Sequence, residues 1–245
     1  MMTLSVSIMI ALLVAVLVTG ISKSGFAGGL GVTVVPFLSF TLPISEAIAL
    51  MLPILIIIDM INVKTWWGKE NRLLLYRVLF FGAIGVLVAT SMFAMFDHAL
   101  LNYFTGGIAL LFGVYGLLSK SSRFIIGEKL GAMLSILAGV TSTLIHAGGP
   151  PINGYLMNLN LSKTQFLATV SMFFAGVNIF KLMPFLVLGN LNWHTFFIAI
   201  SLSPVAFIGI KLGVLMQSKL NQQQFNLVIN WLMIVLGGKL IIGEL

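Results

Sequence analysis

The chain has 245 residues, of which 59% are hydrophobic and only 8% are charged, and it contains no cysteine. A soluble domain carries about 25% charged residues, so the composition excludes an ordinary soluble domain, and the lack of cysteine excludes disulfides and cysteine-based metal sites. The net charge of +7 does not indicate nucleic-acid binding, because the basic residues lie mostly in short segments between apolar runs, as in cytoplasmic loops. We therefore predict an all-α polytopic membrane protein.

The first half of the chain predicts a broken-helix hairpin followed by three transmembrane helices. Its apolar runs place helices at 4–19, 45–63, 73–95 and 100–118, with a break at 20–31 and a short apolar return at 32–42. The break holds Gly28-Gly29, and glycine ends helices because it has no side chain to restrict its backbone. Inside lipid, a broken backbone is found only where protein or a water-filled cavity satisfies its peptide groups.

The second half repeats this plan. Helices are expected at 130–145, 166–188, 193–215 and 225–242, with a break at 148–151 and a short return at 152–161. The second break reads Gly148-Gly149-Pro150-Pro151, and proline both lacks an N–H and clashes with the preceding turn. We predict a single transmembrane domain over 1–245, with a first repeat at about 1–119, a basic loop at 119–129 and a second repeat at about 130–245.

The polar residues of the two halves also coincide. Adding 120 carries Ala27-Gly28-Gly29 onto Ala147-Gly148-Gly149, and adding 119 carries Asp59 onto Asn178 and Asn62 onto Lys181. Because polar residues inside membrane helices are rare, this coincidence indicates an internal duplication. Interrupted helices in corresponding places of two halves are typical of a transport site.

Loop charge favours an inverted arrangement of these repeats. A hairpin that enters and leaves on one side, followed by three spans, gives an odd number of crossings, so the halves face opposite ways. One face then carries Lys64, Lys69, Arg72, Arg77, Lys120, Arg123, Lys129, Lys163, Lys211 and Lys219, and the other only Lys239. If each hairpin were a single crossing, Lys163, Lys211 and Lys219 would change face. The positive-inside rule thus predicts cytoplasmic loops at 64–77 and 119–129 and two periplasmic termini.

Lys181 is the strongest candidate for a functional side chain. It lies within the predicted span 166–188, and a basic residue near the bilayer centre costs about 2.5–3.5 kcal/mol on insertion scales. Such residues usually face a cavity or a partner, so we predict that Lys181 binds an anionic substrate. The alternatives are that its long side chain reaches the membrane interface or pairs with Asp59.

Further charged candidates lie close to the breaks. Lys23, within the first break, could join an anion site made of exposed backbone N–H groups, or could reach the lipid headgroups from a hairpin tip. Asp59 is either a structural counter-ion or a protonatable coupling group. His146, beside the second break, could donate to an anion, carry a coupling proton or simply pack in the core. Three scattered histidines predict no metal site.

The break glycines and some neutral polar residues complete the predicted site. Two hairpin tips meeting near the middle of the membrane would offer free amides and positive helix ends to one small anion. The tip residues expected there are Gly28, Gly29, Gly148 and Gly149. Asn178, Thr143, Ser142 and Asn153 could line a polar path, although Ser and Thr in helices more often bond their own backbone.

Taken together, these features resemble the sulfite exporter TauE/SafE-like family, also called the toluene sulfonate uptake permease family. The resemblance rests on Ala27-Gly28-Gly29, on His146-Ala147-Gly148-Gly149-Pro150, on the series Phe174, Asn178, Lys181 and Gly189, and on a length near 250 residues. It implies a bacterial inner-membrane permease for small sulfur or organic oxyanions such as sulfite, sulfoacetate, other sulfonates or carboxylates. Pro184 stands where similar proteins often carry a tyrosine.

The function predicted from these observations is secondary transport, as an exporter, of a small anion by alternating access at a site between the two Gly-Gly hairpins. The alternatives are an anion channel, a permease for carboxylates or another small solute, and a membrane-embedded enzyme, for which a clustered nucleophile is missing. No Walker loop or Rossmann fingerprint is present, so we expect no nucleotide and no cofactor. The expected partners are the lipid bilayer and the small anion, with a homodimer left open.

Overall fold

The computed structural model describes residues 6–28, 31–95, 98–118, 127–189 and 191–217, together with short pieces between 227 and 242. The described chain is helical, with turns but no strand between the helices. Its helices are α1 (Val6–Gly25), α2 (Gly31–Leu38), α3 (Ile44–Trp66), α4 (Arg72–Met95), α5 (His98–Leu118), α6 (Glu128–Ile145), α7 (Gly149–Leu156), α8 (Lys163–Val187) and α9 (Trp193–Gln217). The predicted all-α class is therefore confirmed. The loop 119–129 and the last predicted span, 225–242, lie largely outside the described residues.

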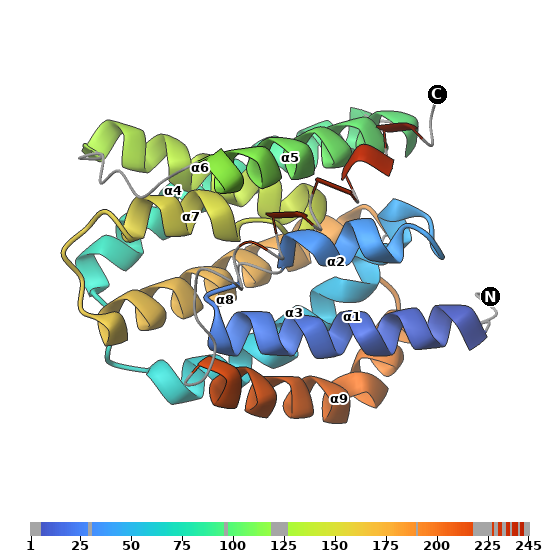
Figure 1. Cartoon of the computed structure of the whole chain (residues 1–245), viewed down its shortest axis with the longest axis horizontal. Coiled ribbons are helices and arrows are strands. Elements are labelled where there is room, and N and C mark those ends of the chain that lie inside the picture. The colour runs from blue at the N-terminus through green and yellow to red at the C-terminus, as the bar shows by residue number, and fades with distance from the viewer. Residues whose placement is uncertain are drawn as a thin grey trace.

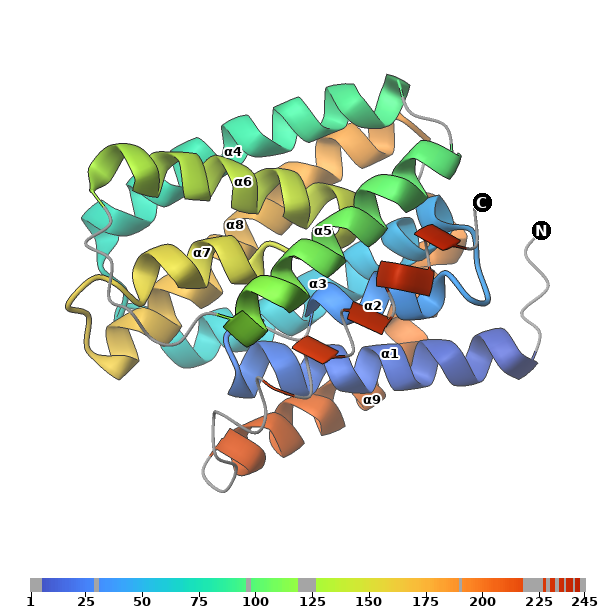
Figure 2. The ribbon, with the colours of Figure 1, turned by 45° about the horizontal axis from the view of Figure 1, so that its top comes forward.

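Within that part of the chain, six helices are long and apolar enough to cross a membrane: α1, α3, α4, α6, α8 and α9. The two short helices, α2 and α7, follow the two breaks. In Figure 1, α1 runs from right to left, and α2 turns back toward the right-hand end. The α6 helix starts from the left-hand end, and α7 turns back toward that end, as Figure 2 also shows. The chain is thus a polytopic helical membrane protein with two broken-helix hairpins.

The first break starts later than predicted. The α1 helix continues past Thr19 to Gly25, so Gly20 and Lys23 belong to the helix and not to the break. A side-chain carbon at Gly20 would lie 2.7 Å from the Ala206 carbonyl oxygen of α9. Glycine at this position therefore lets two helix backbones approach closely, which is a common use of small residues in membranes.

The second break differs from the prediction in the role of its prolines. The α6 helix ends at Ile145, and Pro150 and Pro151 lie in the first turn of α7. Proline is tolerated there because the first N–H groups of a helix have no partner within the helix. The prolines therefore begin a new helix, while His146, in the left-handed conformation with φ 56°, ends the previous one.

The two breaks share one backbone geometry. The Gly28 N–H bonds the Ser22 carbonyl at 3.1 Å, and the Ala147 N–H bonds the Thr141 carbonyl at 3.1 Å. Both hydrogen bonds span the same number of residues, and both enclose a non-glycine residue with positive φ, Ala27 in the first break and His146 in the second. Corresponding residues of the two breaks are therefore 119 positions apart in the chain, whereas the sequence alone suggested 120 there.

The long helices pack in corresponding pairs. The α1 helix packs along α9, α4 packs along α6, and α3 and α8 pack together between them. Close backbone crossings support the first two pairs, at Gly20 with Gly209 and at Gly85 with Gly139. Exchanging each helix for its counterpart in the other half maps these pairs onto one another. Two equivalent repeats would give this pairing, and their inverted orientation in the membrane stays a prediction.

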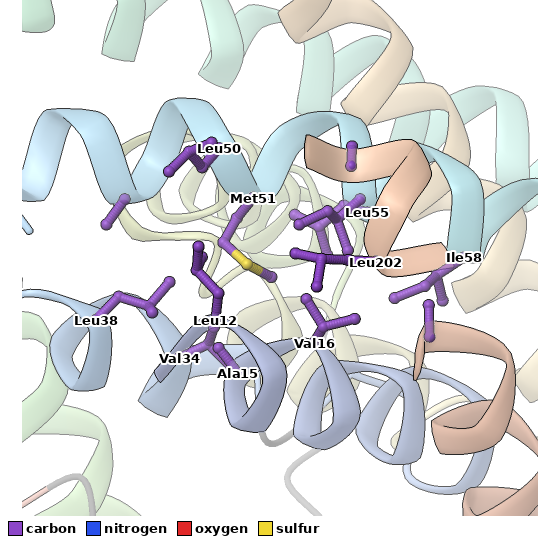
Figure 3. Close-up of a cluster of buried hydrophobic side chains, with 14 of the residues drawn as sticks. Leu12, Ala15, Val16, Val34, Leu38, Leu50, Met51, Leu55, Ile58 and Leu202 are labelled. Carbon is purple, nitrogen blue, oxygen red and sulfur yellow. The ribbon is translucent and has the colours of Figure 1, made fainter. Parts of the chain in front are cut away.

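An apolar core holds the first hairpin against α3 and α9. Figure 3 shows side chains of α1, α2 and α3 meeting in one cluster, with Leu12, Val16 and Met51 among them and Leu202 reaching in from α9. Leu12 and Val16 lie on one face of α1 because residues four apart are neighbours on a helix. This packing fixes the hairpin beside α3, and so determines where the polar residues of α1 meet those of α3.

Candidate functional site

A buried polar cluster lies where the two breaks meet α3 and α8. The end of α1 contributes Lys23, and the end of α6 contributes Ser142 and His146. From the long central helices come Asp59 on α3 and Asn178 and Lys181 on α8. These side chains are largely buried: the exposed fraction runs from 0% for Lys181 to 9% for His146 among the five on α3, α6 and α8, and the side chain of Lys23 is 7% exposed. Polar groups so deep in a membrane protein must be paired or must face a polar cavity.

Asp59 is held by one cation and one amide. The Lys23 ammonium lies 2.5 Å from Asp59 Oδ1, and Asn178 donates from Nδ2 to Asp59 Oδ2 at 2.6 Å. Lys23 also lies 5.1 Å from the centre of the Phe174 ring, within the range of a cation–π interaction. Lys23 therefore points into the protein and does not reach the headgroups, and it, not Lys181, pairs with Asp59.

Lys181 has neutral partners. Its ammonium donates to the Ser142 carbonyl at 2.9 Å, to the Ser142 hydroxyl at 3.1 Å and to His146 Nδ1 at 3.1 Å. These contacts use all three hydrogens of a lysine ammonium. Among the described residues, no carboxylate lies within ion-pair distance of this lysine. The alternatives of reaching the interface or pairing with Asp59 therefore do not describe Lys181.

The contacts of His146 define its tautomer. His146 Nε2 lies 2.9 Å from the Ile48 carbonyl oxygen, which can only accept a hydrogen bond, so Nε2 carries a hydrogen. Because Lys181 donates to Nδ1, that nitrogen carries none. The imidazole in this arrangement is neutral, and both of its nitrogens are engaged.

With both lysines protonated, the cluster has one positive charge more than it has negative charges. Asp59 is then the counter-ion of Lys23, and Lys181 has only the neutral partners Ser142 and His146. A buried charge without a counter-ion is costly unless it is extensively hydrogen-bonded. The arrangement can therefore accept one further negative charge.

A small cavity opens onto this cluster. It is lined by Thr19, Lys23, Gly28, Gly31, Leu55, Ser142, His146, Phe174 and Asn178. The space open to the centre of a water molecule is about 10 Å³, roughly what one water needs. An anion with several heavy atoms requires the surrounding helices to move apart.

Phe174 lies between the two breaks. A side-chain carbon at Gly28 would lie 3.0 Å from the Phe174 ring, and one at Gly148 would lie 3.2 Å from it. The two glycines therefore let both breaks approach the same aromatic ring. Phe174 lies one turn before Asn178 and two turns before Lys181, so helical spacing alone puts these three on one face of α8. That spacing was the signal available for including Phe174 in the predicted site.

Several predicted site residues take other places. Gly29 lies outside the described residues. Gly149 is buried at the start of α7, and Thr143 bonds the Gly139 carbonyl of its own helix at 2.9 Å and does not line the cavity. Asn153 does not line it either, but its Nδ2 donates to the Ala27 carbonyl at 3.0 Å and so links the second hairpin to the first break.

The fold and this cluster define a polytopic helical membrane protein with a buried, net positive polar centre at two broken helices. A comparison with protein families adds the particular family: the family model described as sulfite exporter TauE/SafE matches residues 12–240. The chain belongs to the sulfite exporter TauE/SafE family, a family of membrane transporters for sulfur anions such as sulfite, and the resemblance seen in the sequence is confirmed. No curated protein and no solved structure matches the chain.

Proposed function

We propose that this protein is a secondary transporter that exports small sulfur-containing or organic anions, and that the anion binds beside Lys181 between the two hairpin tips. The observation that carries the proposal is the composition of the buried cluster: it holds two lysines and one carboxylate, which leave a single positive charge when both lysines are protonated. A monovalent anion would neutralise it. The family description names sulfite, and we propose sulfite, sulfoacetate or another sulfonate as the substrate.

The contacts of Lys181 suggest how the anion would be held. Hydrogen bonds between charged groups are roughly twice as strong as those between neutral groups, so an anionic oxygen would be a better acceptor for Lys181 than the Ser142 hydroxyl or His146 Nδ1. Ser142 and His146 both line the cavity. An anion entering there could take over one hydrogen of the ammonium while Ser142 keeps the others.

Transport requires the site to open alternately to each side. The cavity now has room for about one water, which supports a closed state. We place the two inverted repeats at about 1–119 and 130–245, with rocking of one against the other as the opening motion. In this proposal the protein lies in a bacterial inner membrane with both termini in the periplasm and loops 64–77 and 119–129 in the cytoplasm. Asp59 and His146 are the candidates for carrying a coupled proton.

The first test is thermal stabilisation of the detergent-purified protein by a panel of small anions. A ligand present at about 100 times its Kd stabilises the folded state by about 2.7 kcal/mol. We expect stabilisation by sulfite or a sulfonate, its loss in Lys181→Ala, and its persistence in Lys211→Ala, because Lys211 is exposed on α9. Equal stabilisation of Lys181→Ala and the unchanged protein would contradict the proposed site.

Liposomes would then separate a transporter from a channel. With the membrane potential held at zero, unlabelled anion loaded into the liposomes accelerates the uptake of labelled anion through a transporter by counterflow, whereas it does not accelerate uptake through a channel. Conductance without counterflow would contradict secondary transport while leaving the anion site in place.

A further inference from the structure

One polar atom of the cluster has no hydrogen-bond partner among the residues that the structure describes. Asn178 is only 1% exposed and lines the cavity. Its Nδ2 donates to Asp59, but its Oδ1 is buried and makes no hydrogen bond within the described part of the chain. A buried acceptor left without a donor costs about 1–3 kcal/mol. Such an atom in a native structure usually awaits a water or a ligand.

The orientation of this amide follows from its neighbours. Asp59 pairs with Lys23 and is therefore ionised, so both of its oxygens only accept hydrogen bonds. The amide edge that meets Asp59 Oδ2 must then be the NH2 group. Oδ1 of Asn178 consequently remains available on the other edge of the amide, in a side chain that lines the cavity.

This free acceptor and the charge count place two different demands on a bound anion. The excess positive charge favours one negative charge on the ligand. Asn178 Oδ1 requires a hydrogen-bond donor, and it would repel an oxygen that carries only lone pairs. A fully ionised dianion satisfies neither demand, and a sulfonate without a donor satisfies only the first.

We infer that the site selects a singly charged oxyanion that donates one hydrogen bond, and that Asn178 Oδ1 is the specificity-determining acceptor. For sulfite, the selected form is hydrogen sulfite, through its O–H, and not the sulfite dianion. The inference rests on the proposed function and specifies the protonation state of the substrate at the same site.

The charged and titratable groups that line the cavity or bond its lining residues come from four helices. Lys23 on α1 and His146 at the end of α6 line the cavity, Asp59 on α3 bonds Asn178, and Lys181 on α8 bonds His146. The part of α2 that lines the cavity contributes Gly31, which has no titratable side chain. Protonation of any of these groups would change the affinity for every anion, whereas protonation of the ligand changes the affinity for that ligand alone.

The test compares sulfite with methanesulfonate on the full-length protein in detergent, by calorimetric titration from mildly acidic to mildly alkaline pH. Methanesulfonate has one negative charge at every pH in this range and no donor. We expect the Kd for total sulfite to rise about tenfold per pH unit once hydrogen sulfite loses its proton. In acidic buffer methanesulfonate should bind about tenfold more weakly than sulfite, because one hydrogen bond is missing. The ratio of the two Kd values removes effects of protein titration.

Substitution of Asn178 gives a second measurement. Asn178→Leu keeps the size of the side chain and removes the acceptor, so the preference for sulfite over methanesulfonate should fall to about one. Asn153→Leu is the matched control, because Asn153 has a buried unpaired oxygen too but does not line the cavity. In this control the preference should remain.

The possible failures are distinguishable. Sulfite that binds more tightly as pH rises, or methanesulfonate that binds as well as sulfite in acidic buffer, would overturn the inference and leave the proposed function standing. An unchanged preference in Asn178→Leu would mean that water alone satisfies Oδ1, which also overturns it. If neither anion binds at any pH, the proposed function fails, and the inference with it.

Discussion

The two breaks have the same backbone geometry, but the residues at matching positions differ in charge. Both close with a hydrogen bond of the same span, Gly28 to Ser22 and Ala147 to Thr141. At matching positions, however, Lys23 near the end of α1 corresponds to Ser142 near the end of α6, and Ala27 corresponds to His146. The helices behind the breaks differ in the same way, because Asp59 of α3 corresponds to Asn178 of α8.

This difference creates the asymmetry of the site. In the first half the cation on the broken helix has a carboxylate on α3. In the second half the cation is on α8, and the broken helix offers it only a hydroxyl, a carbonyl and a neutral imidazole. A symmetric scaffold can therefore hold an unbalanced charge, which is what a site for one small anion needs.

The largest expected effect comes from removing the carboxylate of the first half. Asp59→Leu leaves the Lys23 ammonium buried without a counter-ion and should cost about 3–5 kcal/mol of stability. Lys181→Met should cost less, because it leaves only neutral acceptors behind. Thermal unfolding of both variants in detergent measures this difference.

The double variant Lys23→Met/Asp59→Leu serves as the control, because it removes both charges of the pair. It should recover most of the stability lost in Asp59→Leu. Equal losses in Asp59→Leu and Lys181→Met would show that the two halves do not differ in the way described.

A smaller effect is expected at the two glycine crossings. A side-chain carbon at Gly20 would press on the Ala206 carbonyl, and one at Gly139 would overlap the Gly82 carbonyl. Gly20→Ala and Gly139→Ala should each destabilise the protein by about 1–3 kcal/mol, because neither backbone can yield freely. Thermal unfolding in detergent would show whether the α1–α9 and α4–α6 crossings respond alike.

Gly107→Ala on α5 is the control for these variants. Apart from its own helix, no atom of the described residues lies within 4 Å of a side-chain carbon at that position, so the higher helix propensity of alanine should leave stability unchanged or raise it by up to about 1 kcal/mol. A loss of stability in only one of Gly20→Ala and Gly139→Ala would show that the two crossings are not equivalent.

The smallest effect is expected for the exposed ion pair between the halves. Arg77 on α4 lies 2.7 Å from Glu128 on α6, and the side chain of Glu128 is 79% exposed. Water and salt screen such a pair, so Arg77→Ala should leave the thermal unfolding midpoint nearly unchanged, and any change should disappear in high salt. A large loss would mean that exposed charge also joins the halves, and not only the buried cluster and the backbone crossings.

Periodicity and composition predicted much of this protein because they reflect local physics. The apolar runs predicted the long helices that the structure describes, since a helix in lipid must satisfy its own backbone and present apolar side chains. The same reasoning identified Lys181 and Asp59 as buried exceptions. The break at His146 was also predicted, although Pro150 and Pro151 start α7 instead of ending α6.

Other features depended on contacts between distant segments. The end of α1 was predicted too early because Gly20 resembles a helix breaker in the sequence, and only α9 shows that it is a crossing point. The partner of Asp59 could not be chosen between Lys23 and Lys181, since both are long side chains whose reach depends on how α1 and α8 pack on α3.

The all-α membrane class and the polar residues within the spans could thus be predicted from the sequence, because each depends on residues close together in the chain. The packing of α1, α3, α6 and α8 decided the rest, namely that Lys23 neutralises Asp59, that His146 presents a bare Nδ1 to Lys181, and that Asn178 keeps an unpaired oxygen. Hydrogen bonds and ion pairs act over a few ångströms, and only the tertiary fold brings residues more than thirty positions apart within that range.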